Sequence, residues 1–380
     1  MDARADWLAC GVAALTGHPD GPPLVPPGRA ASVAAGLGAM FGIDGAALLG
    51  ERAALTGRTR AGRTSVGGAC RLVPLSDGWA AVSCARPDDP ALLGALVEHP
   101  LPDDDPWPLL RAALAVMPAA ELAERATLLG VAAAPVAHPS SHPSSHPGPP
   151  GVASAGRADL RGRLVVSFAA LWAGPLCAHL LRRAGAAVVT VETPQRPDGA
   201  RRGEPRFHAL LHHGERSVVL DPVRDRAALH ALVAAADVVI EGSRPRALRA
   251  WGLHAEEAVA RGSTWVSITA AGRASDRVGF GDDVAAAAGL VALDRDGLPV
   301  FVGDAIADPL TGLTAAALAV RAPGVLHDVS MTAVVADTLD GSAGGPVEEA
   351  PLPRHREIPS GGPALGADTA AVLADLGLRA

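Results

Sequence analysis

Two aspartates, Asp304 and Asp308, stand just before an alanine-rich run that extends from Thr314 to Val320. An aspartate in this position most often caps the helix that follows, because its side chain accepts hydrogen bonds from the first backbone N–H groups. The start of a helix also carries a partial positive charge, which can hold a carboxylate ionised and stabilise an oxyanion. Asp308 can therefore be a helix cap or a nucleophile that attacks a carbonyl carbon.

Glu192 is a candidate for holding a ribose hydroxyl, because it ends a predicted strand where dinucleotide-binding folds place an acidic residue. The preceding turn, residues 169–175, contains a single glycine, Gly174, followed by Pro175. Spaced glycines are needed there to let the backbone approach a pyrophosphate. We therefore expect no NAD site.

The segments that must position these residues alternate between strands and helices after residue 158. We predict strands over 164–168, 187–191, 238–240 and 264–268, and helices over 175–184, 224–235 and 244–250. This alternation is typical of a parallel sheet with crossover helices. The predicted fold class is α/β, a Rossmann-like parallel sheet domain over 158–335 with a smaller α+β domain.

The smaller domain is predicted over residues 1–137, where two short apolar runs, 70–75 and 79–84, flank the turn Ser76-Asp77-Gly78. A helix is predicted over 119–129, ended by Gly130. Residues 138–157, rich in Pro, Ser and His, predict an extended linker. Its repeated prolines prevent a helix that would gather the histidines, so we expect no metal site. Residues 336–380 form a C-terminal returning segment.

Composition excludes several classes of function. The four cysteines are widely scattered, as in a reducing compartment, and the formal charge of -7 with no basic run argues against a nucleic-acid partner. The first residues lack the order of a signal peptide, and no apolar run reaches the length of a membrane span. We expect a soluble, cytoplasmic protein with no membrane contact.

Motifs between residues 163 and 335 carry a resemblance to a known family. They include 171–177 (LWAGPLC), 189–194 (VTVETP), 213–221 (HGERSVVLD), 267–269 (SIT) and 303–312 (GDAIADPLTG). In order and spacing they resemble the family III coenzyme A transferases of the CaiB/BaiF type. The resemblance implies that Asp308 is the nucleophile, that it forms an aspartyl-CoA thioester from an acyl-CoA, and that CoA then passes to a carboxylic acid.

The resemblance also implies that CoA is a substrate rather than a permanent cofactor, that no metal takes part, and that the protein is an interlocked homodimer. Arg196, Arg201 and Arg244 lie where the family places basic residues, so with Glu192 they are the predicted CoA-binding residues. Glu215 stands where the family usually has lysine.

Three functions stay open: a CoA transferase, a racemase and a catalytically silent binder. A racemase on the same fold would need two acid/base groups, and Asp282 could pair with Asp308, although Asp282 and Asp283 are also suited to capping a helix over 284–290. A catalytically silent binder of CoA esters is the third possibility.

The order of the domains departs from the family. The small domain comes before the Rossmann-like part, which is the reverse of the family order. Gly67-Gly68 is either a plain turn or a glycine loop over the site.

Overall fold

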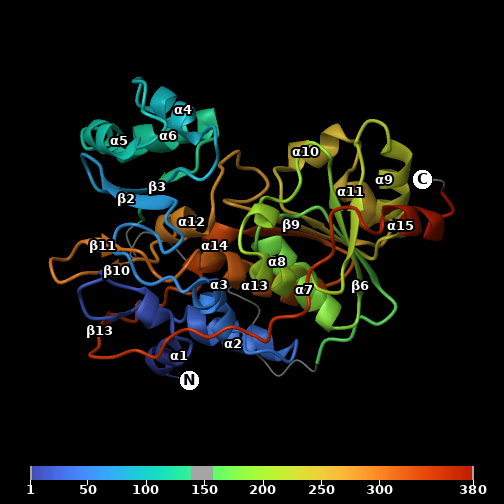
Figure 1. The fold of residues 1–380 in the computed structure, drawn as a ribbon, viewed down its shortest axis with the longest axis horizontal. Coiled ribbons are helices and arrows are strands. Elements are labelled where there is room, and N and C mark those ends of the chain that lie inside the picture. The colour runs from blue at the N-terminus through green and yellow to red at the C-terminus, as the bar shows by residue number, and fades with distance from the viewer. Residues whose placement is uncertain (1, 138–156, 379–380) are drawn as a thin grey trace.

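The computed structural model describes residues 2–137 and 157–378 (Figure 1). Within these ranges the largest sheet has six strands, all parallel, in the order β12-β9-β8-β5-β6-β7. Read from β7 to β12 and numbered along the chain, that order is 3-2-1-4-5-6, the doubly wound arrangement of Rossmann-like folds. The predicted α/β class and parallel sheet are confirmed. The predicted linker and its histidines lie almost wholly outside the described residues.

Four of the six strands, β5, β6, β8 and β9, lie where the sequence predicts strands, whereas β7 and β12 were not predicted. Their bounds are β5 Leu164–Ser167, β6 Ala187–Glu192, β7 Arg216–Val219, β8 Val238–Glu241, β9 Thr264–Thr269 and β12 Leu326–Ser330. Successive side chains enter different cores: Val165 packs in the larger apolar cluster, whereas Val166 packs in the smaller one on the opposite face. Both faces of the sheet are therefore buried, as a parallel sheet requires.

Helices cover the two faces of this sheet. On the face of the larger cluster lie α7 Ala173–Arg183, α8 Pro205–His212, α12 Gly281–Ala287, α13 Ala307–Arg321 and α14 Met331–Ala336. The other face is covered by α9 Arg226–Ala235, α10 Pro245–Ala250, α11 Ala255–Ala260 and α15 Thr369–Asp375. The helix η3 Gly199–Arg202 leads from β6 to α8.

Residues 70–135 form a separate layer, seen above the N-terminal helices in Figure 1. It contains β2 Cys70–Pro74, β3 Trp79–Ser83, α4 Asp89–Leu96, α5 Trp107–Leu114, α6 Ala119–Leu129 and β4 Ala133–Pro135. The three strands pair antiparallel, as the predicted hairpin requires. Gly130 ends α6 at φ +67°, a left-handed conformation that favours glycine.

The helices of residues 3–56 pack into the core of the large sheet rather than into that layer. Here lie α1 Ala3–Ala9, η1 Val12–Leu15, β1 Leu24–Val25, α2 Ala30–Ala39, η2 Ala47–Gly50 and α3 Glu51–Thr56. Trp7, Leu37 and Leu49 are buried in one cluster with Leu176 of α7 and Leu310 of α13. Residues predicted as one small domain thus contribute to two cores, and the predicted domain bounds stay a prediction.

Short strand pairs and an extended tail complete the fold. The strand β1 pairs with β13 Gly345–Pro346, and β10 Ala292–Leu293 pairs with β11 Pro299–Val300. The tail then crosses the molecule to α15, held by Arg356 on Glu51 and by Asp368 on the backbone of Ser217. In the described residues, no helix has the length and apolar character needed to cross a membrane.

Candidate active site

Asp308 lies at the carboxyl edge of the sheet, beside the point where the strand order reverses. That point is between β5 and β8, and α7 is the first helix after β5. The helix α13 precedes β12, so its first residues lie at the same edge. Gly312 allows the two helices to pack closely, since a Cβ there would come within 2.7 Å of the carbonyl oxygen of Ala173. The starts of α7 and α13 therefore meet where such folds bind ligands.

The side chain of Asp308 does not cap its own helix. Ile306 occupies the N-cap position of α13, no side chain makes a capping hydrogen bond, and Asp308 is the second residue of the helix. Instead, the backbone N–H of Ala173, the first residue of α7, favours the ionised form of the carboxylate. A Cβ on Gly281 would overlap Oδ2 of Asp308, so the absence of a side chain there makes room for the carboxyl group.

Burial raises the pKa of Asp308 to about 7, against the opposing effect of the Arg52 guanidinium and with a further rise from Asp282. Burial also raises the pKa of Asp282 to about 6, with Asp304 adding to the rise. The side chain of Asp282 accepts a hydrogen bond of 2.8 Å from the backbone N–H of Ala305. Two carboxyl groups that titrate near neutrality thus lie together at this edge.

Arg52 of α3 supplies the positive charge of the site. Its Nε donates to Oδ2 of Asp304 over 2.8 Å, its Nη2 donates to Oδ1, and Asp304 is fully buried. Its Cζ lies 4.7 Å from the centroid of the Trp172 ring. Burial acts to lower the pKa of Arg52, but Asp304 and, more weakly, Asp282 and Asp308 raise it overall.

Of the two aspartates predicted to cap a helix, Asp283 does so at the start of α12. Oδ1 of Asp283 accepts from the backbone N–H of Phe280 over 2.8 Å, at the start of α12, and from the hydroxyl of Ser83 over 2.9 Å. Asp282 instead joins α12 to the turn before α13. The two neighbouring carboxylates therefore have different structural tasks.

Two residues next to the site have a backbone conformation that is unusual for a side chain. Leu171, just before α7, has φ +71°, and Ala305, just before α13, has φ +46°. Such conformations cost on the order of 1–3 kcal/mol each and concentrate at functional sites. The strained turns adjoin the helix starts between which the Asp308 carboxylate lies.

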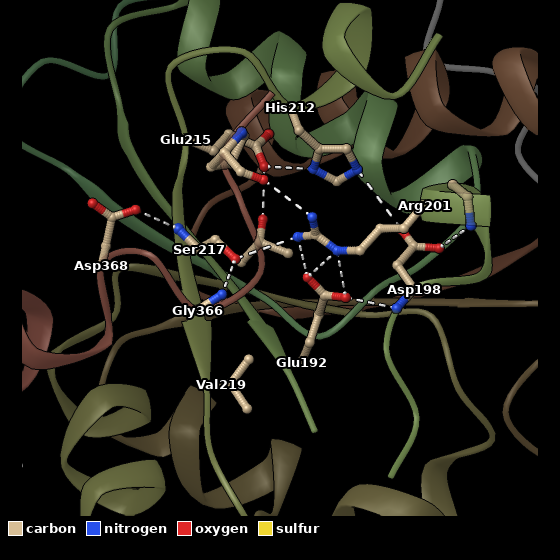
Figure 2. A network of polar contacts seen from close by, with 12 residues as sticks. Glu192, Asp198, Arg201, His212, Glu215, Ser217, Val219, Gly366 and Asp368 are labelled. Carbon is tan, nitrogen blue, oxygen red and sulfur yellow. Dashed lines mark hydrogen bonds and ion pairs between the residues drawn. The ribbon is translucent and has the colours of Figure 1, made fainter. Parts of the chain in front are cut away.

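Glu192 and Arg201, two of the predicted CoA-binding residues, contact each other (Figure 2). Nε of Arg201 donates to both oxygens of Glu192 over 3.0 Å, and only 6% of the Glu192 side chain is exposed. Oε2 of Glu192 accepts from the backbone N–H of Asp198, whose Oδ1 accepts from the backbone N–H of Leu171. The ion pair thus supports the loop that leads into α7, and CoA contact by these two residues stays a prediction.

Arg244 and Arg196 lie in a different, cationic environment. Arg244 is half-buried, and burial lowers its pKa, with Arg246, Arg86 and Arg196 adding to the decrease. A Cβ on Gly130 would lie 3.8 Å from Nη1 of Arg244. This arginine cluster therefore lies where the layer of residues 70–135 faces the large sheet.

A cavity of about 330 Å³ lies along the same carboxyl edge but is not lined by Asp308. Its lining follows the ends of β6 and β7 and the start of α9: Gln195, Asp221, Pro222, Val223, Arg226, Ala250 and Trp251. An aromatic ring and a guanidinium in one cavity are suited to a heterocyclic base.

Gly67, one of the two glycines predicted as a turn or a loop over the site, lies close to it. A Cβ on Gly67 would lie 3.3 Å from Nη2 of Arg52 and 3.7 Å from Oδ1 of Asp304. Arg58 donates to the carbonyl oxygen of Gly67 over 3.2 Å. The glycine therefore belongs to the wall of the site, whichever of the two descriptions applies.

Sequence reasoning missed Arg52 as a member of the site, because no motif surrounds it and 252 residues separate it from Asp304. Trp172 is part of the motif 171–177, but the motif does not indicate its contact with Arg52. No pattern in the sequence pairs these residues. The only indirect signal is that a buried Asp304 requires a cation.

Part of the chain is similar to known proteins. Residues 160–333 match the model of CoA-transferase family III. The chain is 31% identical over 168 residues to succinyl-CoA–D-citramalate CoA-transferase of Chloroflexus aurantiacus, covering 40% of this chain and 42% of the relative. It is 31% identical over 179 residues to succinate–glutarate CoA-transferase of Agrobacterium fabrum, covering 41% and 45%.

Among solved structures, a CAIB/BAIF family protein from Brucella suis matches with 30% identity and a TM-score of 0.44, over 48% of this chain and 56% of that chain. The matched part of this chain spans less than half the length of the two sequence relatives. Asp308, Asp282 and Asp304 lie within the segment matched by the family model, whereas Arg52 lies outside it. Residues 160–333 of this chain therefore belong to CoA-transferase family III.

Proposed function

We propose that this protein transfers coenzyme A between an acyl-CoA and a carboxylic acid, with Asp308 as the nucleophile. The observation that carries the proposal is the environment of Asp308: a carboxyl group with a pKa near 7, off the capping position, between two helix starts and near Arg52. The family membership of residues 160–333 supports it. The relatives named above are CoA-transferases for different acids, so they leave the acid undefined.

The proposed reaction begins when a carboxylate oxygen of Asp308 attacks the thioester carbonyl carbon. The carbon–sulfur bond breaks, CoA leaves as the thiolate, and a mixed anhydride joins Asp308 to the acyl group. The thiolate then attacks Cγ of Asp308, which releases the first acid as a carboxylate and leaves an aspartyl-CoA thioester. The same two steps in reverse, with the second acid, form the new acyl-CoA and restore Asp308.

The residues around Asp308 have complementary tasks in this proposal. The backbone N–H of Ala173 and the Arg52 guanidinium favour the ionised nucleophile, and they are also placed to offset the negative charge of the tetrahedral intermediates. Burial makes the carboxylate more reactive than it would be in water, since fewer water molecules stabilise its charge. The arginine cluster around Arg244 and the cavity beside Trp251 are the proposed contacts for the phosphates and the adenine.

Mass spectrometry of the intact protein tests the nucleophile directly. After incubation with a panel of acyl-CoAs, the protein should gain the mass of CoA less one water, and hydroxylamine should remove the gain. Asp308→Asn should show no gain, whereas Asp296→Asn, an exposed aspartate on the β10–β11 hairpin, should behave as the parent protein. A thioester that survives in Asp308→Asn would refute the assignment.

A racemase is the second candidate, and one observation favours it. Asp282 and Asp308 have raised pKa values of about 6 and about 7, so at neutral pH one can act as an acid while the other acts as a base. Exchange of deuterium from solvent onto the carbon next to the thioester, without an aspartyl-CoA thioester, would support it. Binding of CoA esters with neither reaction would instead identify a silent binder. The homodimer is a further prediction, which analytical ultracentrifugation tests.

A further inference from the structure

The extended tail that leads from β13 to α15 meets the start of α3 at Arg356. Nε and Nη2 of Arg356 donate to the two carboxylate oxygens of Glu51, each over 2.6 Å, and the backbone N–H of Arg356 donates to Oε1 over 3.1 Å. Only 3% of the Glu51 side chain is exposed. Glu51 is the first residue of α3, and Arg52 is the second. A bidentate ion pair with fixed geometry therefore holds the helix start that carries the cation of the site.

The remaining nitrogen of the Arg356 guanidinium contacts α7. Nη1 lies 2.7 Å from Nε2 of His179, a buried residue of this helix. Burial lowers the pKa of His179 well below its ordinary value, and Arg356 adds to the decrease. The imidazole is therefore neutral, and Nε2 can accept a hydrogen bond from the guanidinium. Arg356 thus joins the tail to α3 and to α7 at once.

Two glycines make room for the tail just before this contact. A Cβ on Gly50 would lie 2.7 Å from Cβ of Pro353, and a Cβ on Gly11 would lie 2.5 Å from the backbone nitrogen and Cα of Pro353. Gly11 has φ +80°, a left-handed conformation that favours glycine. Gly50 directly precedes α3. The tail therefore packs against the backbone from which α3 begins.

The tail has a second attachment, at the loop that leads into α7. Nη1 of Arg201 donates to the carbonyl oxygen of Pro363 over 3.1 Å. Through its ion pair with Glu192 (Figure 2), the same arginine supports the loop that ends in the strained turn at Leu171. That turn leads into the first residue of α7, whose backbone N–H favours the ionised form of Asp308. Both groups that favour this form are thus connected to the tail.

We propose that the tail positions the candidate active site, with Arg356 as the positioning residue that holds α3, and with it Arg52, at the carboxyl edge of the sheet. This inference rests on the proposed function of Asp308 as the nucleophile. Arg356 acts through Glu51 and the start of α3 rather than by contact with the reacting atoms. Without this contact α3 is free to shift, and the guanidinium of Arg52 moves away from the carboxyl groups that it faces.

The charges that act on Asp308 lie on different elements. Arg52 of α3 favours its ionised form, whereas Asp282 and Asp283 of α12 oppose it. Asp304, in the turn before α13, pairs with the guanidinium of Arg52. A shift of α3 therefore weakens the favourable effect and leaves both unfavourable charges in place. The expected result is a carboxyl group that keeps its proton to a higher pH.

The test measures the ionisation of Asp308 directly. In the full chain labelled with carbon-13 at the aspartate carboxyl groups, the NMR signal of Asp308 is the one that Asp308→Asn lacks, and its pH titration gives the midpoint. Arg356→Gln should raise this midpoint by about 0.5 or more, since a nearby opposite charge lowers the pKa of a carboxyl group by about 1–3. Arg356→Lys, which keeps the charge without the paired donors, should show a smaller rise.

Glu51→Gln separates positioning from a direct effect of charge. Loss of the Arg356 charge would by itself raise the pKa of Asp308, whereas loss of the Glu51 charge would by itself lower it. Loss of the contact between the tail and α3 raises it in both variants. An upward shift of the midpoint in Glu51→Gln supports the inference, and it decides the question even if Arg356→Gln does not fold. A downward or absent shift in either folded variant overturns the inference.

Arg354 provides the matched control on the same tail. It is exposed, and it contacts Asp44 and the carbonyl oxygen of Ala9, neither of which belongs to α3. Arg354→Gln should therefore leave the titration of Asp308 unchanged. If its midpoint moved as far as that of Arg356→Gln, the effect would belong to the tail as a whole, and the role of Arg356 would be overturned.

The titration and the CoA-transfer assay can fail separately. If the Asp308 midpoint rises in Arg356→Gln and Glu51→Gln but no acyl-CoA ever forms an aspartyl-CoA thioester, the inference about position stands and the proposed function fails. If the thioester forms on Asp308 while neither variant changes its titration, the proposed function stands and the inference fails.

Discussion

Replacing Asp308 by Asn should stabilise the protein at alkaline pH, even though it abolishes the proposed nucleophile. The folded protein keeps the proton on Asp308 up to about pH 7, whereas an unfolded chain releases it near the ordinary pKa of 3.8. Between these values the folded state binds more protons than the unfolded state, so its stability falls as the pH rises. Asparagine has the same shape and cannot ionise, so it removes this loss.

The difference between 3.8 and about 7 corresponds to roughly 4 kcal/mol at pH 8, as an upper figure, because each pKa unit is worth about 1.4 kcal/mol. At pH 4 the same comparison gives less than about 1 kcal/mol. Urea denaturation of the parent protein and of Asp308→Asn, at several pH values from 4 to 8, measures the difference. It should grow with pH up to about 7 and then level off.

Asp296→Asn is the matched control, since the same substitution is made at an exposed carboxylate on the β10–β11 hairpin. Its stability should follow that of the parent protein at every pH. If Asp308→Asn were less stable than the parent at pH 8, or if the difference did not depend on pH, the carboxyl group would be well solvated or already paired. The account of the site would then be refuted.

Three further predictions concern the neighbours of Asp308. Arg52→Met should destabilise the protein by about 3–5 kcal/mol in urea denaturation, because it leaves Asp304 buried without its partner, and Arg52→Lys should lose less. Gly281→Ala should lose CoA transfer and about 1–3 kcal/mol of stability, because the new Cβ meets Asp308, whereas Gly78→Ala, with open space around it, should lose neither. The rate of CoA transfer should increase with pH through about 7 as Asp308 ionises. Asp282→Asn should move the midpoint of the pH–rate profile to a lower pH, because the Asp282 charge raises the pKa of Asp308. A shift of the midpoint to a higher pH would contradict this.

The strands and crossover helices of the large sheet could be predicted because they depend on short-range patterns. Valines in 165–166 and 188–189 are flanked by helical segments, and the structure confirms strands at both places. The position of Asp308 at the start of a helix was likewise visible, because an aspartate before an alanine-rich run is a local signal. What it does there was not visible, since the helix cap is set by backbone geometry.

The partners of the site residues could not be predicted, because they come from distant parts of the chain. Arg52 reaches Asp304 across 252 residues, and nothing around either residue indicates the pairing. For Glu192 and Arg201, which are close in sequence, the residue types alone do not distinguish contact with CoA from contact with each other. Their types suit a ligand, but only the folded structure places them against each other, where they support the loop before α7.

The origin of Arg52 outside the segment shared with known transferases has a consequence for how such a site can change over evolution. The proposed nucleophile and the helix starts around it are encoded in one stretch of the gene, while the cation that favours its ionised form is encoded in another. Substitutions near the beginning of the chain can therefore alter the acidity of Asp308 while the segment shared with its relatives is unchanged. The acidity of the Asp308 carboxyl group can therefore change in evolution independently of the fold that holds it.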